Sequence, residues 1–503
     1  MNFARDVVDR APPERRALVE LTRDGARREY TFGEVSELGA RLAGTLQRHG
    51  VRRGDVVMTL IGNRPEWALT LLACFRIGAV ALPCNEQLRA GDLRLRLAAA
   101  HPSLILADER NRAELEAARP LCPVLTIPDP TLFAAEPAPA VELHPREPCL
   151  IVFTSGTTGE PKGIVHGQRY LSGQRLQAEH WLDARPGELV WCTAASGWSK
   201  SARNAFIAPW LRGAAALLHD ARFDPAQRLE ILASERVNVL CMAPTEYRVI
   251  AKRQTLQPLP ALRALVAAGE ALNPEVLATF REELGLDIRD GYGQTETGQL
   301  TANPPGRPAR PGSMGLPLPG VRLTVQDGEL VLSDPRSDPT FFVSYLPSRA
   351  EPIESGAGIA GLRQQRQGSE AAPEDEPWHT GDCVHQDQDG YLYFEGRADD
   401  LIISAGYRIG PFEVESALIS HPAVAEAAVV GVPDEERGAV VKAVVVLREG
   451  HAPDEPLAAE LQEHVKRRTA PYKYPRIVEF ARELPKTASG KVRRALLRMP
   501  SPR

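Results

Sequence analysis

Residues 149–163 read CLIVFTSGTTGEPKG, an apolar run followed by a loop rich in serine, threonine and glycine. The apolar run is typical of a buried strand in a parallel sheet. The glycines let consecutive backbone N–H groups turn toward one anion, while the hydroxyls and a lysine add donors. The stretch therefore predicts a phosphate-binding loop at the end of a strand. Its candidate residues are Thr154, Ser155, Gly156, Thr157, Thr158, Gly159 and Lys162.

This loop differs from that of an ordinary P-loop ATPase or kinase. The spacing G-x-x-x-x-G-K-[ST] does not occur in it, and Lys162 stands between Pro161 and Gly163. A plain surface turn is the alternative interpretation when the run is considered by itself.

Apolar runs alternate with helical patterns on both sides of the loop, which predicts repeated βα units and parallel sheets. The runs are 56–61, 79–83 and 103–107 before the loop, and 237–242 and 262–269 after it. Asn273 and Pro274 are typical of an N-cap and a first helical position. An α/β fold with two doubly wound αβα layers accounts for this alternation most economically.

The pattern changes after residue 310. Residues 311–333 predict short strands of a small β-barrel-like unit, and residues 347–377, rich in Gly, Pro, Ser, Gln and charge, predict a mobile surface insertion. Strands at 401–406, 425–432 and 439–447 with a helix at 456–469 predict a small α+β unit. The predicted domains are 1–397 and 398–503.

The composition excludes several classes of protein. The 503 residues are 43% hydrophobic and 25% charged, which excludes collagen-like, coiled-coil and wholly disordered chains. The net charge of -5 gives no overall attraction to nucleic acid or to an acidic membrane. Seven cysteines without a C-x-x-C pair indicate neither disulfides nor a zinc site. With no signal-peptide run at the start and no uninterrupted membrane span, a cytoplasmic protein is expected.

Further motifs follow the loop in a fixed order: GEALNPE (269–275), DGYGQTETG (290–298), WHTGD (378–382), GRADDLIISAGYRIGPFEVE (396–415), APYKYPR (470–476) and LPKTASGKVRR (484–494). Together with TSGTTGEPKG they make the chain resemble the adenylate-forming acyl-CoA synthetases, most closely their medium-chain branch. The resemblance covers roughly residues 30–500. It implies an enzyme that uses ATP, Mg²⁺ and CoA to activate a carboxylic acid as an acyl-adenylate and then transfer the acyl group to CoA.

The resemblance also implies roles for individual residues. Tyr292 would stack on adenine, although by itself it could equally be a core aromatic; Asp382 would accept the ribose hydroxyls, and Arg397 would contact ribose or phosphate. Glu296 after Thr295 would be the Mg²⁺ ligand. The remaining nucleotide-binding candidates are Gly269, Glu270, Ala271, Asp290, Gly291, Gly293 and Gln294.

The C-terminal motifs would serve both half-reactions. Lys491 would reach the acid carboxylate and the α-phosphate, where charge accumulates during adenylation, and Asp399 would be the hinge between two orientations of the C-terminal domain. Residues 463–503 contain 12 Lys or Arg against 3 Glu, which suits the phosphates of CoA. The candidate CoA residues are Ala405, Gly406, Tyr407, Arg408, Arg437, Lys466, Tyr474 and Arg476.

The acid itself is the least determined part. Trp198 and Gly293 are the candidate acyl-pocket residues, and because acetate-activating relatives carry a Trp at the position of Gly293, a longer acid is expected. Medium-chain fatty or aromatic acids are therefore favoured. Ser344 and Ala405 replace a more usual Gly and Ser of the family pattern without touching a residue assigned to chemistry.

Two alternatives remain open. The chain could load its acyl group onto a carrier protein, although no carrier domain follows the last motif and the basic segment suits CoA better. It could instead be a noncatalytic nucleotide sensor or a nucleic-acid-binding protein that uses its basic tail. The presence of Lys162, Glu296, Asp382 and Lys491 together argues against that second class.

Overall fold

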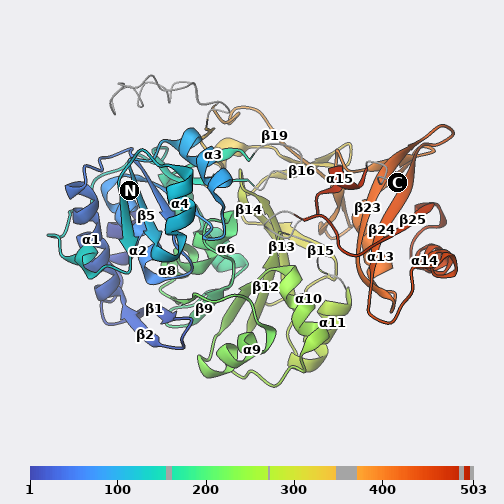
Figure 1. Ribbon diagram of the computed structural model, residues 1–503, viewed down its shortest axis with the longest axis horizontal. Coiled ribbons are helices and arrows are strands. Elements are labelled where there is room, and N and C mark those ends of the chain that lie inside the picture. The colour runs from blue at the N-terminus through green and yellow to red at the C-terminus, as the bar shows by residue number, and fades with distance from the viewer. Residues whose placement is uncertain (155–160, 270–271, 273, 347–370, 487–491, 499–503) are drawn as a thin grey trace.

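The computed structural model comprises residues 1–503 and describes all of them except 155–160, 270–271, 273, 347–370, 487–491 and 499–503. Figure 1 shows the N-terminal third of the chain (blue and cyan) at one end of the long axis and the C-terminal unit (orange and red) at the other. None of the described helices combines the length and the apolar character that crossing a bilayer requires.

The largest sheet has thirteen strands and runs through the middle of the molecule. In spatial order they are β16 (Leu323–Gln326), β17 (Glu329–Leu332), β19 (Trp378–Gln386), β20 (Leu392–Arg397), β15 (Ser313–Pro317), β14 (Gly298–Ala302), β13 (Ile288–Gln294), β12 (Ala264–Ala268), β11 (Val239–Met242), β9 (Leu189–Cys192), β10 (Ala215–His219), β1 (Arg16–Leu21) and β2 (Arg27–Thr31). The strands from β13 to β1 pair in parallel, and those from β9 to β12 are buried along their length, as continuous apolar runs require.

A second sheet has seven strands. Their order is β18 (Ser344–Tyr345), β8 (Gly163–Gly167), β7 (Pro148–Phe153), β4 (Val80–Cys84), β3 (Val56–Leu60), β5 (Leu104–Asp108) and β6 (Val124–Ile127). The strands from β7 to β6 are parallel, whereas β8 turns back antiparallel to β7. The two predicted layers and their apolar strands are confirmed.

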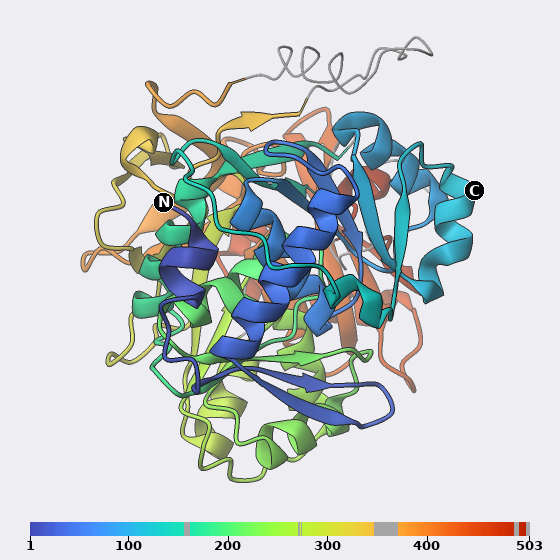
Figure 2. The ribbon, with the colours of Figure 1, turned by 90° about the vertical axis from the view of Figure 1, so that its left-hand side faces the viewer.

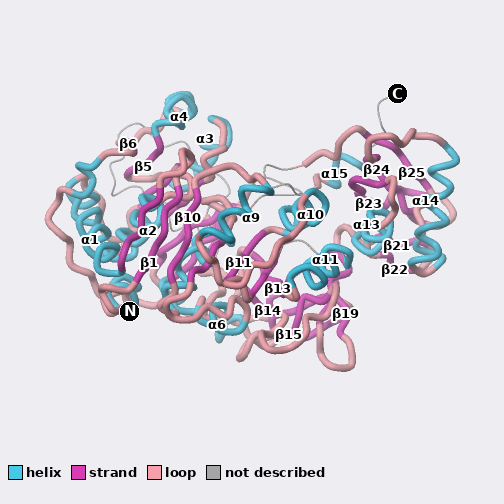
Figure 3. The backbone as a smooth tube through the Cα atoms, turned by 90° about the horizontal axis from the view of Figure 1, so that it is seen from below, coloured by secondary structure: helices cyan, strands magenta, loops and turns pink. Residues whose placement is uncertain are grey.

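Helices pack on both sheets. They are α1 (Phe32–Arg48), α2 (Pro65–Ile77), α3 (Ala90–Ala100), α4 (Arg112–Ala118), α5 (Gln168–Gly173), α6 (Arg175–His180), α7 (Ser199–Ala202), α8 (Ala208–Leu211), α9 (Pro225–Ser234), α10 (Pro244–Arg253) and α11 (Pro274–Leu284). A capping box formed by Thr31 and Glu34 starts α1. Figure 2 shows the blue helices of the first hundred residues covering the face toward the viewer, and Figure 3 shows α9, α10 and α11 beside β11 to β13.

The C-terminal unit has its own small core. It consists of the hairpin β21 (Ile402–Ser404) and β22 (Tyr407–Ile409), the sheet β23 (Val424–Asp434), β24 (Gly438–Leu447) and β25 (Ile477–Ala481), and the helices α13 (Pro411–Ile419), α14 (Glu455–Arg468) and α15 (Arg494–Leu497). Val414, Val429 and Leu461 from three of these elements are fully buried in that core. The predicted α+β unit and its helix at 456–469 are thus observed.

Two of the predicted segments make contacts that the sequence did not reveal. The small β unit is continuous with the large sheet, because β15 hydrogen-bonds to β14. The predicted mobile insertion lies largely outside the described residues, but its end is anchored. Ala371 bridges to Ser344, and the buried Glu374 forms ion pairs with Arg146 and Arg169. The N-cap expected at Asn273 lies outside the described residues, whereas Pro274 does begin α11.

The buried Glu374 gives a stability prediction. Replacing it with Gln removes the counter-charge of Arg169, whose side chain is 14% exposed, so the free energy of unfolding should fall by about 2 kcal/mol. Urea titration followed by tryptophan fluorescence measures this. The matched control is Asp375→Asn, an 80% exposed partner of Arg336 that should change stability by less than about 0.5 kcal/mol. Equal effects of the two substitutions would contradict the anchoring role of Glu374.

Candidate active site

The described ends of the predicted phosphate loop are held together at the base of the β7–β8 hairpin. The Thr154 N–H donates to the Lys162 carbonyl (2.9 Å), and the Lys162 N–H donates to Thr154 Oγ1 (3.1 Å). Because β7 and β8 are antiparallel, these contacts join the facing ends of the two strands. Ser155, Gly156, Thr157, Thr158 and Gly159 lie outside the described residues.

Tyr345 connects this loop to the segment that contains Glu296. The Lys162 ammonium lies 5.4 Å from the centre of the Tyr345 ring, and the Tyr345 hydroxyl donates to Glu296 Oε1 (3.4 Å). Thr295 precedes Glu296 in the turn between β13 and β14. Burial raises the pKa of Glu296, while the hydrogen bond from Tyr345 and the charges of Arg397 and Lys162 oppose that rise. The structure thus brings a candidate phosphate-binding lysine and a candidate metal-binding carboxylate to one aromatic ring.

Asp382 is the centre of a second cluster. The residue is 4% exposed, and its carboxylate accepts hydrogen bonds from the Tyr292 hydroxyl, from Gln294 Nε2 (2.8 Å) and from Arg397 Nη1 (3.3 Å). Trp378 Nε1 in turn donates to Gln294 Oε1 (3.1 Å). Three strands supply these side chains, and each is a residue of a predicted motif.

Strand geometry explains why these residues meet. Asp382 on β19 stands directly opposite Arg397 on β20 in the antiparallel register. Tyr292 and Gln294 are two residues apart on β13 and therefore project to the same face. Burial, and then the neighbouring Asp382 charge, raise the pKa of Tyr292, which keeps its hydroxyl a donor.

Gly293 faces the other way, and this corrects the predicted acyl pocket. A Cβ atom on Gly293 would lie 1.7 Å from the Gly298 carbonyl oxygen and 2.9 Å from the Gln299 Cα of β14. The backbone of β14 thus occupies the space where a side chain at position 293 would begin. Gly293 therefore does not leave the volume of an indole for the acid. The expectation that this position lengthens the acyl pocket is wrong.

Lys200 was not predicted, although it follows Trp198 by two residues. Its ammonium donates to the Ala268 carbonyl (3.1 Å) at the carboxyl end of β12 and lies 3.4 Å from where a Cβ on Gly269 would be. Burial raises the pKa of Asp290 well above its ordinary value, and the Lys200 charge opposes that rise. A lysine directly after Gly-Trp-Ser, at the start of α7, was the signal that could have identified it.

The other residues of these motifs occupy the same edge of the sheet. Gly269 follows β12 with a φ of +103°, a conformation that favours glycine, and Gly291 is buried within β13. Trp198 is half-buried and precedes α7. Glu270 and Ala271 lie outside the described residues.

The candidate CoA residues form two neighbouring groups on the C-terminal unit. In the first, the Ala405 N–H donates to the Arg437 carbonyl (2.9 Å), and the half-exposed Tyr407 stacks on Tyr472 with ring centres 4.3 Å apart. Ala405 (φ +48°) and Gly406 (φ +82°) turn the backbone between β21 and β22, and Arg408 lies in β22.

Cation–π contacts with Tyr474 hold the second group together. The Lys466 ammonium and the Arg476 guanidinium lie 4.2 and 5.0 Å from the centre of the Tyr474 ring. Tyr474 is two residues beyond Tyr472, so the two groups are adjacent along the chain. The structure therefore brings two of the predicted basic residues, Lys466 and Arg476, to one aromatic ring on the C-terminal unit.

Two further predicted residues flank the junction with the C-terminal unit. Asp399 is half-exposed; Arg397 Nε lies 3.6 Å from its carboxylate, and Arg498 donates to its carbonyl (3.1 Å). Lys491 lies outside the described residues, but Lys486 and Val492 bridge across the base of its loop. Within the described part of the chain, no group of three His, Cys, Asp or Glu side chains could hold a metal ion by itself.

Comparisons with known proteins agree with this geometry. The family model for the AMP-binding enzyme matches residues 4–335, and that for the AMP-binding enzyme C-terminal domain matches residues 413–491. The mitochondrial acyl-coenzyme A synthetase ACSM4 of Homo sapiens is 38% identical over 99% of this chain and 90% of its own length. The crystal structure of a Brucella canis acyl-CoA synthetase is 33% identical with a TM-score of 0.72, covering 99% of this chain and 94% of its own. The anthranilate CoA ligase AuaEII, solved with anthranoyl-AMP, is 30% identical with a TM-score of 0.83, covering 99% and 96% of the two chains.

The backbone contact of Gly293 predicts a loss of activity that does not depend on the acid. Gly293→Ala must displace β13 from β14, and β13 also carries Tyr292 and Gln294 of the Asp382 cluster. We expect kcat/KM to fall by about 100-fold for short and long acids alike, because a small displacement of positioning groups is costly. Pyrophosphate release with several acids measures this.

Gly91→Ala is the matched control, since its new Cβ on the exposed start of α3 meets no atom within 4 Å. It should leave activity unchanged. A Gly293→Ala enzyme that loses only its long acids would restore the acyl-pocket role.

Proposed function

We propose that this chain, a member of the AMP-binding enzyme family and an ATP-dependent acid–CoA ligase, activates a medium-chain fatty or an aromatic acid. An oxygen of the acid carboxylate attacks the α-phosphorus of ATP, and the bond from that phosphorus to pyrophosphate breaks. The CoA sulfur then attacks the carbonyl carbon of the acyl-adenylate, and AMP leaves with the bonding electrons. Both steps need charged groups placed before the reactants bind.

The observation that carries the nucleotide assignment is the Asp382 cluster. A buried carboxylate held by Arg397, Gln294 and Tyr292 has a fixed position and is therefore preorganised to accept ribose hydroxyls. The same contacts fix the Tyr292 ring, which we assign to the adenine face opposite the backbone at Gly269. Asp290 and Gly291 lie on the same strand, beside these groups.

The phosphates are assigned to the β7–β8 loop. Thr154 and Lys162 stand at its base, and Lys162 and Glu296 meet at Tyr345. Mg²⁺ at nucleotide sites is commonly bound by one or two carboxylates together with phosphates and waters, so the single half-buried carboxylate of Glu296 is sufficient. Bound there, Mg²⁺ would neutralise phosphate charge as pyrophosphate leaves.

The C-terminal unit is assigned to both half-reactions. We place the domain boundary at 397/398 and the hinge at Asp399, immediately after the arginine that holds Asp382. A cavity of about 480 Å³ separates the two domains, with Glu275 and His385 on one side and Phe412 and Lys473 on the other. This incomplete contact is consistent with a unit that turns between an adenylation orientation, using Lys491, and a thioester-forming one.

The acid remains the part to be tested first. Gly293 gives no support for a long acid. The proposal of a medium-chain or aromatic acid is therefore supported by similarity to an anthranilate CoA ligase and to acyl-CoA synthetases. The half-buried Trp198 and the Lys200 ammonium beside Gly269 are candidates for contact with the acid. Pyrophosphate release with acids from acetate to decanoate and with substituted benzoates tests the proposal. A wild-type enzyme that prefers acetate would contradict it.

We propose a cytoplasmic enzyme whose partners are small molecules. All seven cysteines are free, which suits the reducing cytoplasm, although the human relative carries "mitochondrial" in its name. The small-molecule acid and CoA are the partners; no nucleic acid is needed to account for the basic groups.

Removing the Lys491 ammonium should separate the two half-reactions. Lys491→Ala should reduce adenylate formation by on the order of 100-fold, as for the loss of one preorganised charged donor. Synthetic acyl-adenylate plus CoA should still give thioester at a rate near that of the wild type. The control is Lys486→Ala, which removes a lysine of the same loop that pairs with Glu426 (2.6 Å) and should leave adenylation nearly intact. Equal loss of both half-reactions in Lys491→Ala would contradict its role.

Reversing one charge of the basic groups should affect CoA alone. The Arg437 side chain makes no ion pair within the described residues, so Arg437→Glu breaks no structural pair, and it should raise the KM for CoA by about tenfold. The KM for ATP should stay unchanged, and dephospho-CoA should discriminate less between the two enzymes if the lost contact is to the 3′-phosphate. Arg482→Glu, an exposed site outside the two groups, is the control with the same charge change. Equal damage to ATP and CoA use would point to misfolding.

A further inference from the structure

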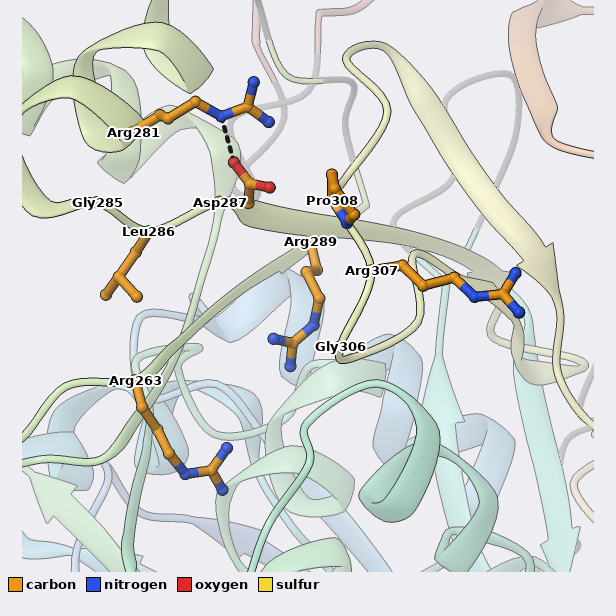
Figure 4. A pocket seen from close by; sticks show the side chains of 9 residues that line it. All are labelled: Arg263, Arg281, Gly285, Leu286, Asp287, Arg289, Gly306, Arg307 and Pro308. Carbon is orange, nitrogen blue, oxygen red and sulfur yellow. Dashed lines mark hydrogen bonds and ion pairs between the residues drawn. The ribbon is translucent and has the colours of Figure 1, made fainter.

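A second cavity lies at the opposite end of the parallel strands from the nucleotide-binding residues. It has a volume of about 450 Å³, within the range of small-ligand sites, and four arginines line it: Arg263, Arg281, Arg289 and Arg307. Figure 4 shows Arg289 reaching from β13 into the space between Arg263 and Gly306, with Arg281 on the far rim and Arg307 extending outward.

The position of the cavity separates it from the catalytic residues. Arg263 immediately precedes β12, and Arg289 is the second residue of β13, whereas Gly269 and Gln294 stand at the carboxyl ends of these two strands. Tyr292 is the third residue after Arg289, which corresponds to roughly 10 Å along a strand. A ligand here would not compete for the residues that hold the nucleotide.

Arg289 is buried and only partly satisfied. It is 8% exposed, and its Nη2 donates to the Trp181 carbonyl (2.6 Å), while Trp181 Nε1 donates back to the Arg289 carbonyl (3.1 Å). Within the described residues its Nε has no hydrogen-bond partner, and its Nη1 makes no hydrogen bond or ion pair. The side chain is therefore held rigidly while part of its guanidinium lacks an acceptor.

The pKa of Arg289 agrees with this geometry. This pKa is lowered to about 10, chiefly by burial; the positive charges of Arg263 and Arg185 act in the same direction, and the negative charge of Asp183 opposes them. A buried cation beside other cations is costly unless an anion joins them.

The carboxylates near the cavity already form ion pairs with arginines other than Arg289 and Arg307. Arg263 pairs with Asp183 and Glu188, and Arg281 pairs with Asp287, each at 2.5 Å. Arg185 also binds Asp183 (2.8 Å). When Arg185, which does not line the cavity, is counted with the four lining arginines, five arginines are set against three carboxylates, which leaves two net positive charges.

The fifth arginine of this set, Arg307, stands at the mouth. Its side chain is exposed and makes no hydrogen bond or ion pair within the described part of the chain. With Arg289 it accounts for the two unbalanced charges.

We propose that this cavity is a second anion site, which binds a phosphoryl group carrying about two negative charges. A tetrahedral dianion matches the net charge and offers several oxygens to guanidinium groups that approach from different directions. Inorganic phosphate, pyrophosphate and a phosphate monoester share this chemistry. A planar monoanionic carboxylate would satisfy fewer donors and only half of the charge.

Titration calorimetry on the full-length protein, without Mg²⁺ and at constant ionic strength, tests the site. Inorganic phosphate, pyrophosphate and phenyl phosphate are the three phosphoryl probes, and acetate is the carboxylate control. We expect the phosphoryl probes to bind and acetate to bind at least about tenfold more weakly. The strongest of the three probes identifies whether the site favours a free anion or an ester.

Four variants assign the binding to this cavity. Arg307→Glu reverses an exposed charge at the mouth and should weaken binding at least about threefold, while Arg289→Gln should weaken it at least about tenfold. Arg322→Glu makes the same charge change at a 75% exposed arginine that does not line the cavity, and Lys162→Ala alters the catalytic phosphate loop. Both of these should retain the wild-type affinity at this site.

Several results would overturn the proposal. They are an absence of phosphoryl binding, acetate binding as tight as phosphate, equal weakening by Arg307→Glu and Arg322→Glu, and loss of all binding in Lys162→Ala. The last result would place the anion in the catalytic loop. If Arg289→Gln fails to fold by circular dichroism, the comparison of Arg307→Glu with Arg322→Glu decides the question.

Discussion

The cross-strand pair of Asp382 and Arg397 is the contact on which the site depends. A buried carboxylate is stable only with partners that satisfy its charge, and the β19–β20 register places Arg397 directly opposite it. Arg397 is also the last residue of β20, and its Nε lies 3.6 Å from Asp399. One guanidinium therefore contacts both the proposed ribose carboxylate and the proposed hinge. A ligand that binds to Asp382 would therefore change the surroundings of a side chain that also contacts the start of the C-terminal unit.

Much of the fold could be predicted because parallel strands covered on both faces must be apolar throughout. The runs at 56–61, 103–107 and 237–242 have this character, and the structure places strands there. What the pattern could not reveal was long-range pairing. The order of the thirteen strands depends on pairing between residues that are far apart in the sequence. Ser313 of β15, for example, pairs with Tyr393 of β20. Composition likewise predicted a mobile segment up to residue 377, yet one buried Glu374 with two arginines anchors its end.

The identities of the site residues were more predictable than their directions. Tyr292, Gln294, Asp382 and Arg397 belong to motifs, and the structure brings these four together. Gly293 lies inside the same motif, but a side chain at this position would point at the backbone of β14. That contact depends on the pairing of β13 with β14, which could not be read from the motif. Lys200 could be recognised as a charge near Trp198. Its contact with the Ala268 carbonyl could not be predicted, because it depends on how α7 lies against the end of β12.

Strand β13 shows how one element can serve two chemically different sites. Its carboxyl end supplies Tyr292 and Gln294 to Asp382, whereas near its amino end Arg289 faces the arginine-lined cavity. Because Arg289 and Asp290 are adjacent, their side chains project to opposite faces of the sheet. Both are desolvated, and burial raises the pKa of the acid while it lowers that of the arginine. An anion bound at Arg289 would therefore contact the same strand that carries Tyr292 and Gln294 to the Asp382 cluster.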